Sequence, residues 1–339
     1  MNRIARLTVI TIALIAFLSQ GLSALTIKIG SIAPDRSPWD KGLEELSREW
    51  QKITNGSIKL KIYPGGIAGS EEDMIRKMRV GILGGAGLTN MGMTHIYSDI
   101  FVLNLPFQFT SESEFEYVLK KMRPQFEKGI EDKGYKLLIW TVSGWVNFFS
   151  KNPVLTPDDL RKHKISFSTG MPKMEQAWKV AKFQVIPNDL KDMLMALQSG
   201  MVDAFYLPPL IAGSGQYFPL APNMCSLKVA PILGGIVITN RIWNRVPKQY
   251  REPMLAATNK LSENLSGRIK KLERETLETM KEHGLVINQV PPEAIEKWRT
   301  APAKGVDYLI GKAFSKEMYD RIQTHLRNYR NMHGEQKNR

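Results

Sequence analysis

The segment Asp158–Gly170 (DDLRKHKISFSTG) carries three hydroxyls and two lysine amines at close spacing, and its pattern is that of a short helix running into a strand. Ser166 follows Ile165 in the strand, where a small polar side chain contributes little to packing. It therefore either faces solvent or stands at a position that binds a ligand. Lys162 and Lys164 precede it and are candidate partners for an anionic group.

Catalytic and metal-binding patterns are missing from the sequence. It contains no HExxH and no GxSxG segment, its five histidines are scattered, and the single Cys225 excludes a thiolate zinc site. The glycine-rich stretch Gly81–Gly92 lacks the order of a dinucleotide-binding or phosphate-binding loop, which favours close backbone packing over ligand contact. We therefore predict no catalytic residue, no metal ligand and no cofactor. A hydrolase site assembled from distant residues stays open as an alternative.

Residues 1–24 have the pattern of a secretory signal peptide. Two arginines precede an uncharged apolar run, Leu7 to Leu18, and small residues follow. We expect cleavage after Ala24, with Gly21 as the alternative site, and an uncleaved anchor is the other interpretation. A single cysteine gives an exported chain no internal disulfide. The sequence therefore predicts a soluble periplasmic protein of a bacterium.

The chain is basic, with a formal net charge of +14 that falls to +12 when Arg3 and Arg6 leave with the signal peptide. A basic surface can favour an anionic membrane, an anionic ligand or a nucleic acid. Export argues against nucleic acid. The basic residues also stand among acidic ones, as in RIKKLERETLETMKEH, which is typical of a solvated helix face.

Four helix starts are marked by a capping hydroxyl with a carboxylate three residues later. The capping residues are Ser37, Ser70, Ser111 and Thr156. A long helix is expected from about Pro247 to His283, with Gly284 just past its end. Short apolar segments lie between the helices, namely LTIKIGSIA, SIKLKIYP, KLLIWTV, KISFS, GIVITN and LVINQV. Strands alternating with helices indicate an α/β fold.

Several segments resemble, in order and spacing, the solute-binding proteins of TRAP transporters (tripartite ATP-independent periplasmic transporters), the DctP-like family. They are IKIGSIAPDRSPWDKGLEEL, TNGSIKLKIYPGGIAGSEEDMIRKMRVG, LNLPFQF, NPVLTPDDLRKHKI and DMLMALQSGMVDAFYLPP, followed by the tail helices from Trp243 to Gly284. The resemblance covers essentially the whole chain after the signal peptide. The YPGG-x-x-GSEEDM and ALQ-x-G-x-VD segments are specific when found together.

The resemblance implies a two-lobed periplasmic-binding-protein fold with a central ligand cleft and a long lobe-spanning helix. Residues 25–143 plus about 233–272 would form lobe I, and residues 144–232 plus about 273–339 would form lobe II. It also implies that the protein captures a small solute in the periplasm and delivers it to the membrane permease subunits. No enzymatic activity is expected, since closure of two lobes needs no nucleophile.

The sequence departs from the family where an organic acid would be held. The family arginine after D-L-K-G-x-K-[IV], which pairs with the ligand carboxylate, aligns with Ser166. A second family arginine aligns with Val146, and a family asparagine aligns with Leu207. The resemblance places ten residues at the ligand, namely Ile32, Thr89, Trp145, Val146, Ser166, Thr169, Leu190, Phe205, Tyr206 and Leu207. This set is apolar with a few hydroxyls, so we predict a neutral or largely hydrophobic ligand.

Two alternatives remain open. The first is an organic acid held by a relocated cation, for which Arg36, Lys162, Lys164 and Lys173 are the nearest candidates in sequence. The second is an exported interaction or scaffold protein that has lost solute binding.

Overall fold

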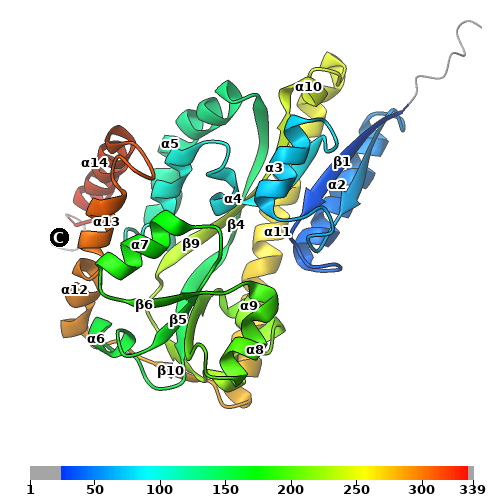
Figure 1. The fold of residues 1–339 in the computed structure, drawn as a ribbon. Helices are drawn as coiled ribbons and strands as arrows, with labels where there is room; N and C mark the ends of the chain where they lie inside the picture. The colour runs from blue at the N-terminus through cyan, green and yellow to red at the C-terminus, as the bar shows by residue number, and fades with distance from the viewer. Residues whose placement is uncertain (1–23, 335–339) are drawn as a thin grey trace, which may run out of the picture.

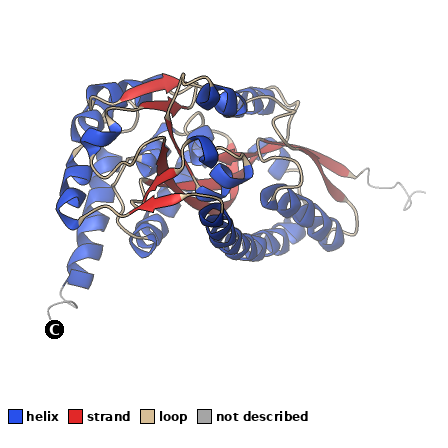
Figure 2. Cartoon of the chain, turned by 90° about the horizontal axis from the view of Figure 1, so that it is seen from below, coloured by secondary structure: helices blue, strands red, loops and turns tan. Residues whose placement is uncertain are grey.

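The computed structural model describes residues 24–334, so the predicted signal peptide before Ala24 lies outside the described residues. Within them, eight strands follow the path β2-β1-β3-β9-β4-β7-β5-β6, while β8 pairs with β4 and β10 pairs with β8. Helices cover the strands on either side, as Figures 1 and 2 show. The predicted α/β architecture is therefore confirmed.

The first strand group holds β1 (Leu25–Ser31), which runs parallel to β2 (Ile58–Tyr63) and β3 (Gly85–Thr89). β9 (Ala230–Thr239) pairs antiparallel with both β3 and β4 (Tyr135–Ser150). Glycine is required at the start of β3, because a Cβ on Gly85 would lie 2.6 Å from the carbonyl oxygen of Val237. The glycine-rich stretch thus serves close strand packing at this point, as predicted.

The second strand group is built on the last part of β4. It contains β7 (Ala204–Leu207), β5 (Lys164–Phe167), β6 (Gln184–Pro187), β8 (Asn223–Cys225) and β10 (Val286–Asn288). β5 runs parallel to both β6 and β7, and β7 pairs antiparallel with β4. β4 thus joins the two groups. Its pairing with β9 shifts register between Val142 and Gly144, which marks a bulge midway along the strand.

The four predicted helix starts are confirmed. They open α2 (Pro38–Ile53), α3 (Glu71–Arg79), α5 (Glu112–Asp132) and α6 (Pro157–Leu160), and each capping hydroxyl accepts from the backbone three residues on. The reciprocal bond of a capping box is present in α3 and α6. In α2 the carboxylate of Asp40 instead accepts from the backbone N–H of Arg36 at 2.9 Å. Arg36 has a φ of 61°, in the left-handed region.

The long helix α11 (Lys248–Glu282) matches its prediction, and Gly284 follows it with a φ of 98°. Its first half packs on α2, where Nε1 of Trp50 donates to the carbonyl of Met254 at 3.3 Å. Its last turns pack on α9 (Pro209–Ser214), and Met280 joins the apolar core of the second strand group. One helix therefore spans both strand groups.

The remaining helices are short, apart from the last. They are α4 (Asn90–Met93), η1 (Ser98–Asn104), α7 (Pro172–Val180), η2 (Leu190–Asp192), α8 (Met193–Gln198), η3 (Phe218–Leu220), α10 (Asn240–Trp243), α12 (Pro292–Thr300), α13 (Ala303–Leu309) and α14 (Lys316–Gly334). α13 packs on α7 and α14 packs on α5. The tail helices seen at the left of Figure 1 therefore touch both strand groups. Between residues 24 and 334, no helix is both long and apolar enough to cross a membrane.

Candidate ligand-binding site

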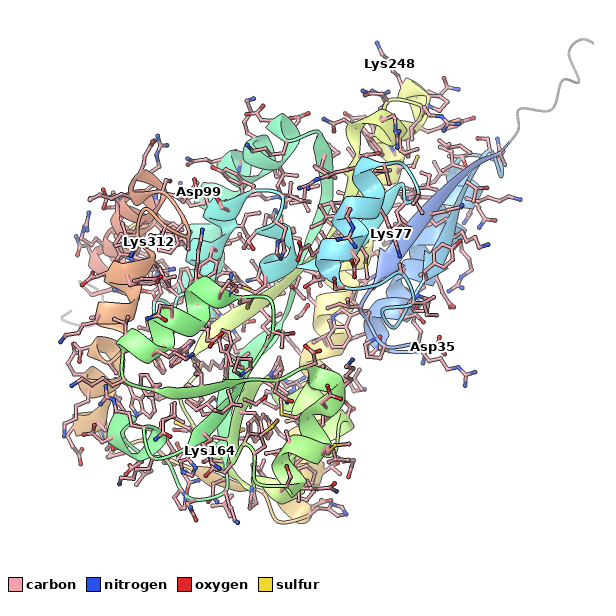
Figure 3. The ribbon with its side chains drawn as sticks, viewed as in Figure 1. Asp35, Lys77, Asp99, Lys164, Lys248 and Lys312 are labelled. Atoms are coloured by element: carbon pink, nitrogen blue, oxygen red, sulfur yellow. The ribbon has the colours of Figure 1, made fainter. Side chains whose placement is uncertain are left out.

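The predicted site residues gather mainly where parallel strands end, the edge at which α/β folds bind ligands. Ile32 follows β1 and Thr89 closes β3 in the first strand group. Thr169 follows β5 and Leu190 follows β6 in the second strand group. In Figure 3, Asp35 marks the end of the first group turned toward α8 and α9, and Lys164 lies at the far end of the second group. We refer to the loops that follow β1, β2, β3, β5, β6 and β7 as the strand-end region.

Large apolar side chains are exposed in this region. Ile32 is 40% exposed, Leu190 is 48% exposed, and Ile67 in the loop after β2 is 75% exposed. Each of the three follows a parallel strand, so apolar side chains are accessible to solvent after β1, β2 and β6.

Ser166 is buried rather than exposed, with only 3% of its surface accessible. Its Oγ accepts a hydrogen bond of 3.2 Å from Nδ2 of Asn188, which follows β6. Sδ of Met193 lies 3.9 Å from the same nitrogen. Two short polar groups and a thioether therefore occupy the space into which a longer side chain at this position would extend.

Thr89 is joined to a residue that the sequence did not single out for the site. Oε1 of Glu71 accepts from the backbone N–H of Thr89 at 2.5 Å, and Oε2 accepts from its hydroxyl at 3.0 Å. A Cβ on Gly92 would overlap the same carboxylate, so Gly92 makes room for it. Burial raises the pKa of Glu71 to about 7 despite these bonds. The end of β3 therefore carries a buried carboxyl group that is neutral in part of the population near neutral pH.

The three predicted residues of β7 divide between its two faces. The ring of Phe205 is fully buried and stacks on Phe149, with centroids 5.0 Å apart and planes 9° apart. Tyr206 points to the other face, where its ring contacts Phe148, Phe167 and Trp178. Burial raises the pKa of Tyr206. Leu207 is half-buried beside the Phe205 cluster.

Trp145 and Val146 lie just beyond the bulge of β4, and each is 4% exposed. The Trp145 ring meets Phe115 edge-on at 6.0 Å, and Nζ of Lys228 lies 5.4 Å from it. Thr169 is exposed, and its hydroxyl donates to the carboxylate of Asp189.

In this conformation the structure therefore exposes Ile32, Thr169 and Leu190, and leaves Thr89, Tyr206 and Leu207 partly accessible. Trp145, Val146, Ser166 and Phe205 are covered, so their contact with a ligand stays a prediction.

Three of the four candidate cations are engaged away from the strand-end region. Nζ of Lys164 donates to the carbonyl of Gly200 at 2.8 Å, at the amino end of β5. Lys162 pairs with Asp159 at 3.2 Å, and Lys173 donates to the carbonyl of Lys312. Arg36 lies in the loop after β1, where its Nε is 3.7 Å from a carboxylate oxygen of Asp35 and its side chain is 88% exposed. It is the one of the four that lies in a strand-end loop.

A cavity of about 580 Å³ lies elsewhere, between the loop after η1 and helices α12, α13 and α14. Its walls include Phe107, Arg299, Val306 and Arg330. None of the ten predicted residues lines it. Among residues 24–334, no cluster of His, Cys, Asp and Glu has the composition of a metal site.

Known proteins match the chain along most of its length. The family described as "Bacterial extracellular solute-binding protein, family 7" (DctP) matches residues 29–312. The 2,3-diketo-L-gulonate-binding periplasmic protein YiaO of Escherichia coli is 22% identical over 278 residues, covering 81% of this chain and 84% of that protein. The sialic acid-binding periplasmic protein SiaP of Vibrio cholerae is 21% identical over 308 residues, covering 89% and 93%.

Solved structures match the fold as a whole. A TRAP periplasmic solute-binding protein from Roseobacter denitrificans, with bound β-D-glucuronate, gives a TM-score of 0.80 at 20% identity, covering 88% of this chain and 99% of that one. The two-lobed fold predicted from the sequence is therefore confirmed.

Proposed function

This chain belongs to family 7 of the bacterial extracellular solute-binding proteins, and from that premise we propose that it captures a neutral or largely apolar small molecule for a TRAP transporter. Members of this family bind solutes and are not enzymes. The chain would hold its solute between the two strand groups in the periplasm and release it to the membrane permease subunits. The boundaries of the two lobes, near residues 143 and 232 and within α11, belong to the same proposal.

The proposal rests on two features together. Apolar side chains are exposed at the strand ends, and uncharged residues stand where the resemblance implies arginines. Ile32, Ile67 and Leu190 present apolar surface at the strand ends. At the two positions where the resemblance implies an arginine, the chain has Ser166 and Val146, and Ser166 already accepts a hydrogen bond from Asn188. A carboxylate bound there would keep its charge uncompensated in a closed site.

Native mass spectrometry of the protein purified without refolding tests this proposal directly. We expect one co-purified small molecule, released on denaturation and identified as uncharged or apolar. A thermal-shift series should then show a rise in Tm with that compound and with lipophilic analogues. Strong stabilisation by uronic acids, sialic acid or succinate, with none from neutral compounds, would contradict it.

A second candidate is an organic acid held by Arg36. It is favoured by the exposed guanidinium after β1, and by similarity to a protein whose structure contains β-D-glucuronate. Under this candidate, Arg36→Gln would weaken acid binding by about 10-fold or more, since a charge-assisted bond contributes roughly 1.5–3 kcal/mol. Under the first candidate, Arg36→Gln would leave the Kd of an apolar ligand within about 2-fold.

A further inference from the structure

The bulge of β4 at Gly144 lies against the carboxylate of Glu273 in the long helix α11. Gly144 at the bulge has a φ of 118°, and a Cβ there would lie 2.8 Å from Oε2 of Glu273 in α11 and 3.5 Å from Pro208. Glu273 thus reaches the point where the strand crosses from the first group to the second. Its Oε2 is buried and has no hydrogen-bond partner among the described residues.

Charged groups face this carboxylate from several elements. Lys228, in the loop between β8 and β9, is close enough to lower the pKa of Glu273, while Glu112 at the start of α5 raises it. Lys270 lies one turn back on α11 and pairs with Glu112 at 2.7 Å. Burial has the largest effect and raises the pKa of Glu273 overall. Lys228 itself forms no ion pair within 4.0 Å in the described part of the chain, and its Nζ lies beside the Trp145 ring.

Gly144 and Glu273 lie where the first strand group joins the second, which is the place expected for a hinge. Upstream of Glu273, Ser262 of α11 donates to the carbonyl of Trp140 at 2.8 Å, which ties the helix to the first strand group. Downstream, Met280 packs in the core that contains Phe149 and Phe205. Gly144 lies between these two attachments, and a bulged strand and a positive φ already break regular geometry there, which makes it a candidate pivot for a change in the angle between the groups.

We propose that Lys228 and Glu273 form an ion pair when the two strand groups close, so that they act as a latch at the hinge. An unpartnered buried carboxylate is unfavourable, and a cation already lies near it. A small rotation at Gly144 that brings Lys228 into contact would satisfy both groups at once. The pair would favour the closed form without touching the ligand. This inference rests on the proposed function, because it assumes a hinge that closes around a solute.

The ion pair between Lys228 and Glu273 would make the population of the closed form depend on pH. In the described conformation, which we take as the open form, burial raises the pKa of Glu273 and so favours its neutral acid. Pairing with Lys228 favours the carboxylate, so closing releases a proton from those molecules in which Glu273 is protonated. By linkage, raising the pH through the open-form pKa shifts the population toward the closed form.

Distances between two nitroxide labels measure the population of the closed form without a ligand. Glu49 on α2 and Ser199 after α8 are both exposed, and each is replaced by cysteine for labelling in a Cys225→Ala background. Pulsed electron paramagnetic resonance then gives the distance distribution of ligand-free protein at pH about 5 and about 8. We expect the short-distance population to grow by about 2-fold or more at the higher pH. Glu273→Gln and Lys228→Met should both remove this response, and Lys228→Arg should keep it.

Glu275→Gln is the matched control, because Glu275 is exposed on the same helix and faces Lys271 at 3.8 Å. It should respond to pH as the unmodified chain does. Circular dichroism on each variant confirms folding. An unmodified chain with the same distances at both pH values, or a response that survives in Glu273→Gln, would overturn the latch. Absence of any bound solute would overturn the proposed function and leave the pH response in place, so the two failures are distinguishable.

Discussion

The hydroxyl of Ser166 lies 3.2 Å from the amide nitrogen of Asn188, which donates to it, and both side chains are buried. This pair closes a space beneath the loop that follows β6. The serine is therefore neither a weak strand residue nor a free surface hydroxyl. It is one half of a satisfied polar pair that leaves no room for a cation.

Ser166→Arg should destabilise the protein. The guanidinium would enter a space filled by Asn188 and Met193, and burying its charge there would lower the free energy of unfolding by about 2–4 kcal/mol. Chemical denaturation measures this loss. Ser168→Arg, two residues on at an exposed position, is the control and should change stability by less than about 0.5 kcal/mol. A stable Ser166→Arg protein that gains affinity for organic acids would show that the site still accepts a cation.

Ile32→Asp should weaken binding without lowering stability much, because Ile32 is already 40% exposed in the described structure. Closure would bury the new carboxylate against an apolar ligand, and we expect the Kd to rise by about 10-fold or more. Titration calorimetry with the co-purified compound measures it. Val80→Asp at the end of α3 is the matched control, since Val80 is 67% exposed and remote from the strand ends. Equal effects of the two substitutions would count against the strand-end site.

Glu71→Gln should change how stability depends on pH. Burial raises the pKa of Glu71 from 4.5 to about 7, so neutral Glu71 stabilises the fold below pH 4.5 and this contribution is lost as the pH rises through about 7. Glutamine cannot ionise. Relative to the unmodified protein, Glu71→Gln should therefore gain a few degrees in Tm between pH about 4 and about 8. Glu72→Gln changes the exposed neighbour and should show no such gain. A difference in Tm between Glu71→Gln and the unmodified protein that does not change with pH would contradict the raised pKa of Glu71.

Phe205→Ala should lower the free energy of unfolding by about 3–5 kcal/mol, because it leaves a cavity beside Phe149 and Tyr217. Tyr206→Phe is its matched partner on the same strand. The Tyr206 hydroxyl forms no hydrogen bond in the described part of the chain, so its removal should change stability by less than about 1 kcal/mol. Denaturant titration of both variants checks the assignment. If Phe205→Ala lost little stability but bound its ligand more weakly, Phe205 would instead contact the ligand.

Local signals in the sequence predicted the helix starts well. Ser70 and Asp73 satisfy each other's backbone groups, so the start of α3 depends on four adjacent residues. β6 (QVIP) and β7 (AFYL) are not among the predicted strands, because neither run alternates apolar and polar residues, whereas β5, which is equally short, does alternate in KISFS. KLLIWTV covered only part of β4, since the bulge at Gly144 lets the strand continue where the pattern breaks.

The site was harder to predict than the fold. Strand direction decides that Lys164 lies at the amino end of β5 while Thr169 lies past its carboxyl end, and the sequence spacing of five residues conceals this separation. Glu71 resembled one more acidic residue in a helix start, and its bond to Thr89 depends on β3 ending beside α3. A signal was present, since an acidic residue that follows a strand-end loop is a candidate for the binding edge.

The strand path gives the chain a particular order of assembly. β9 comes from residues 230–239, yet it lies between β3 and β4, whose residues end at 89 and 150. Until β9 is in place, β3 and β4 each present an unpaired edge. Fragments that stop before residue 230 should therefore aggregate, and neither strand group can be produced alone from one continuous piece of the chain. We therefore expect the sheet to be completed only after residues up to the end of β9 are available, since contacts between distant residues form slowly.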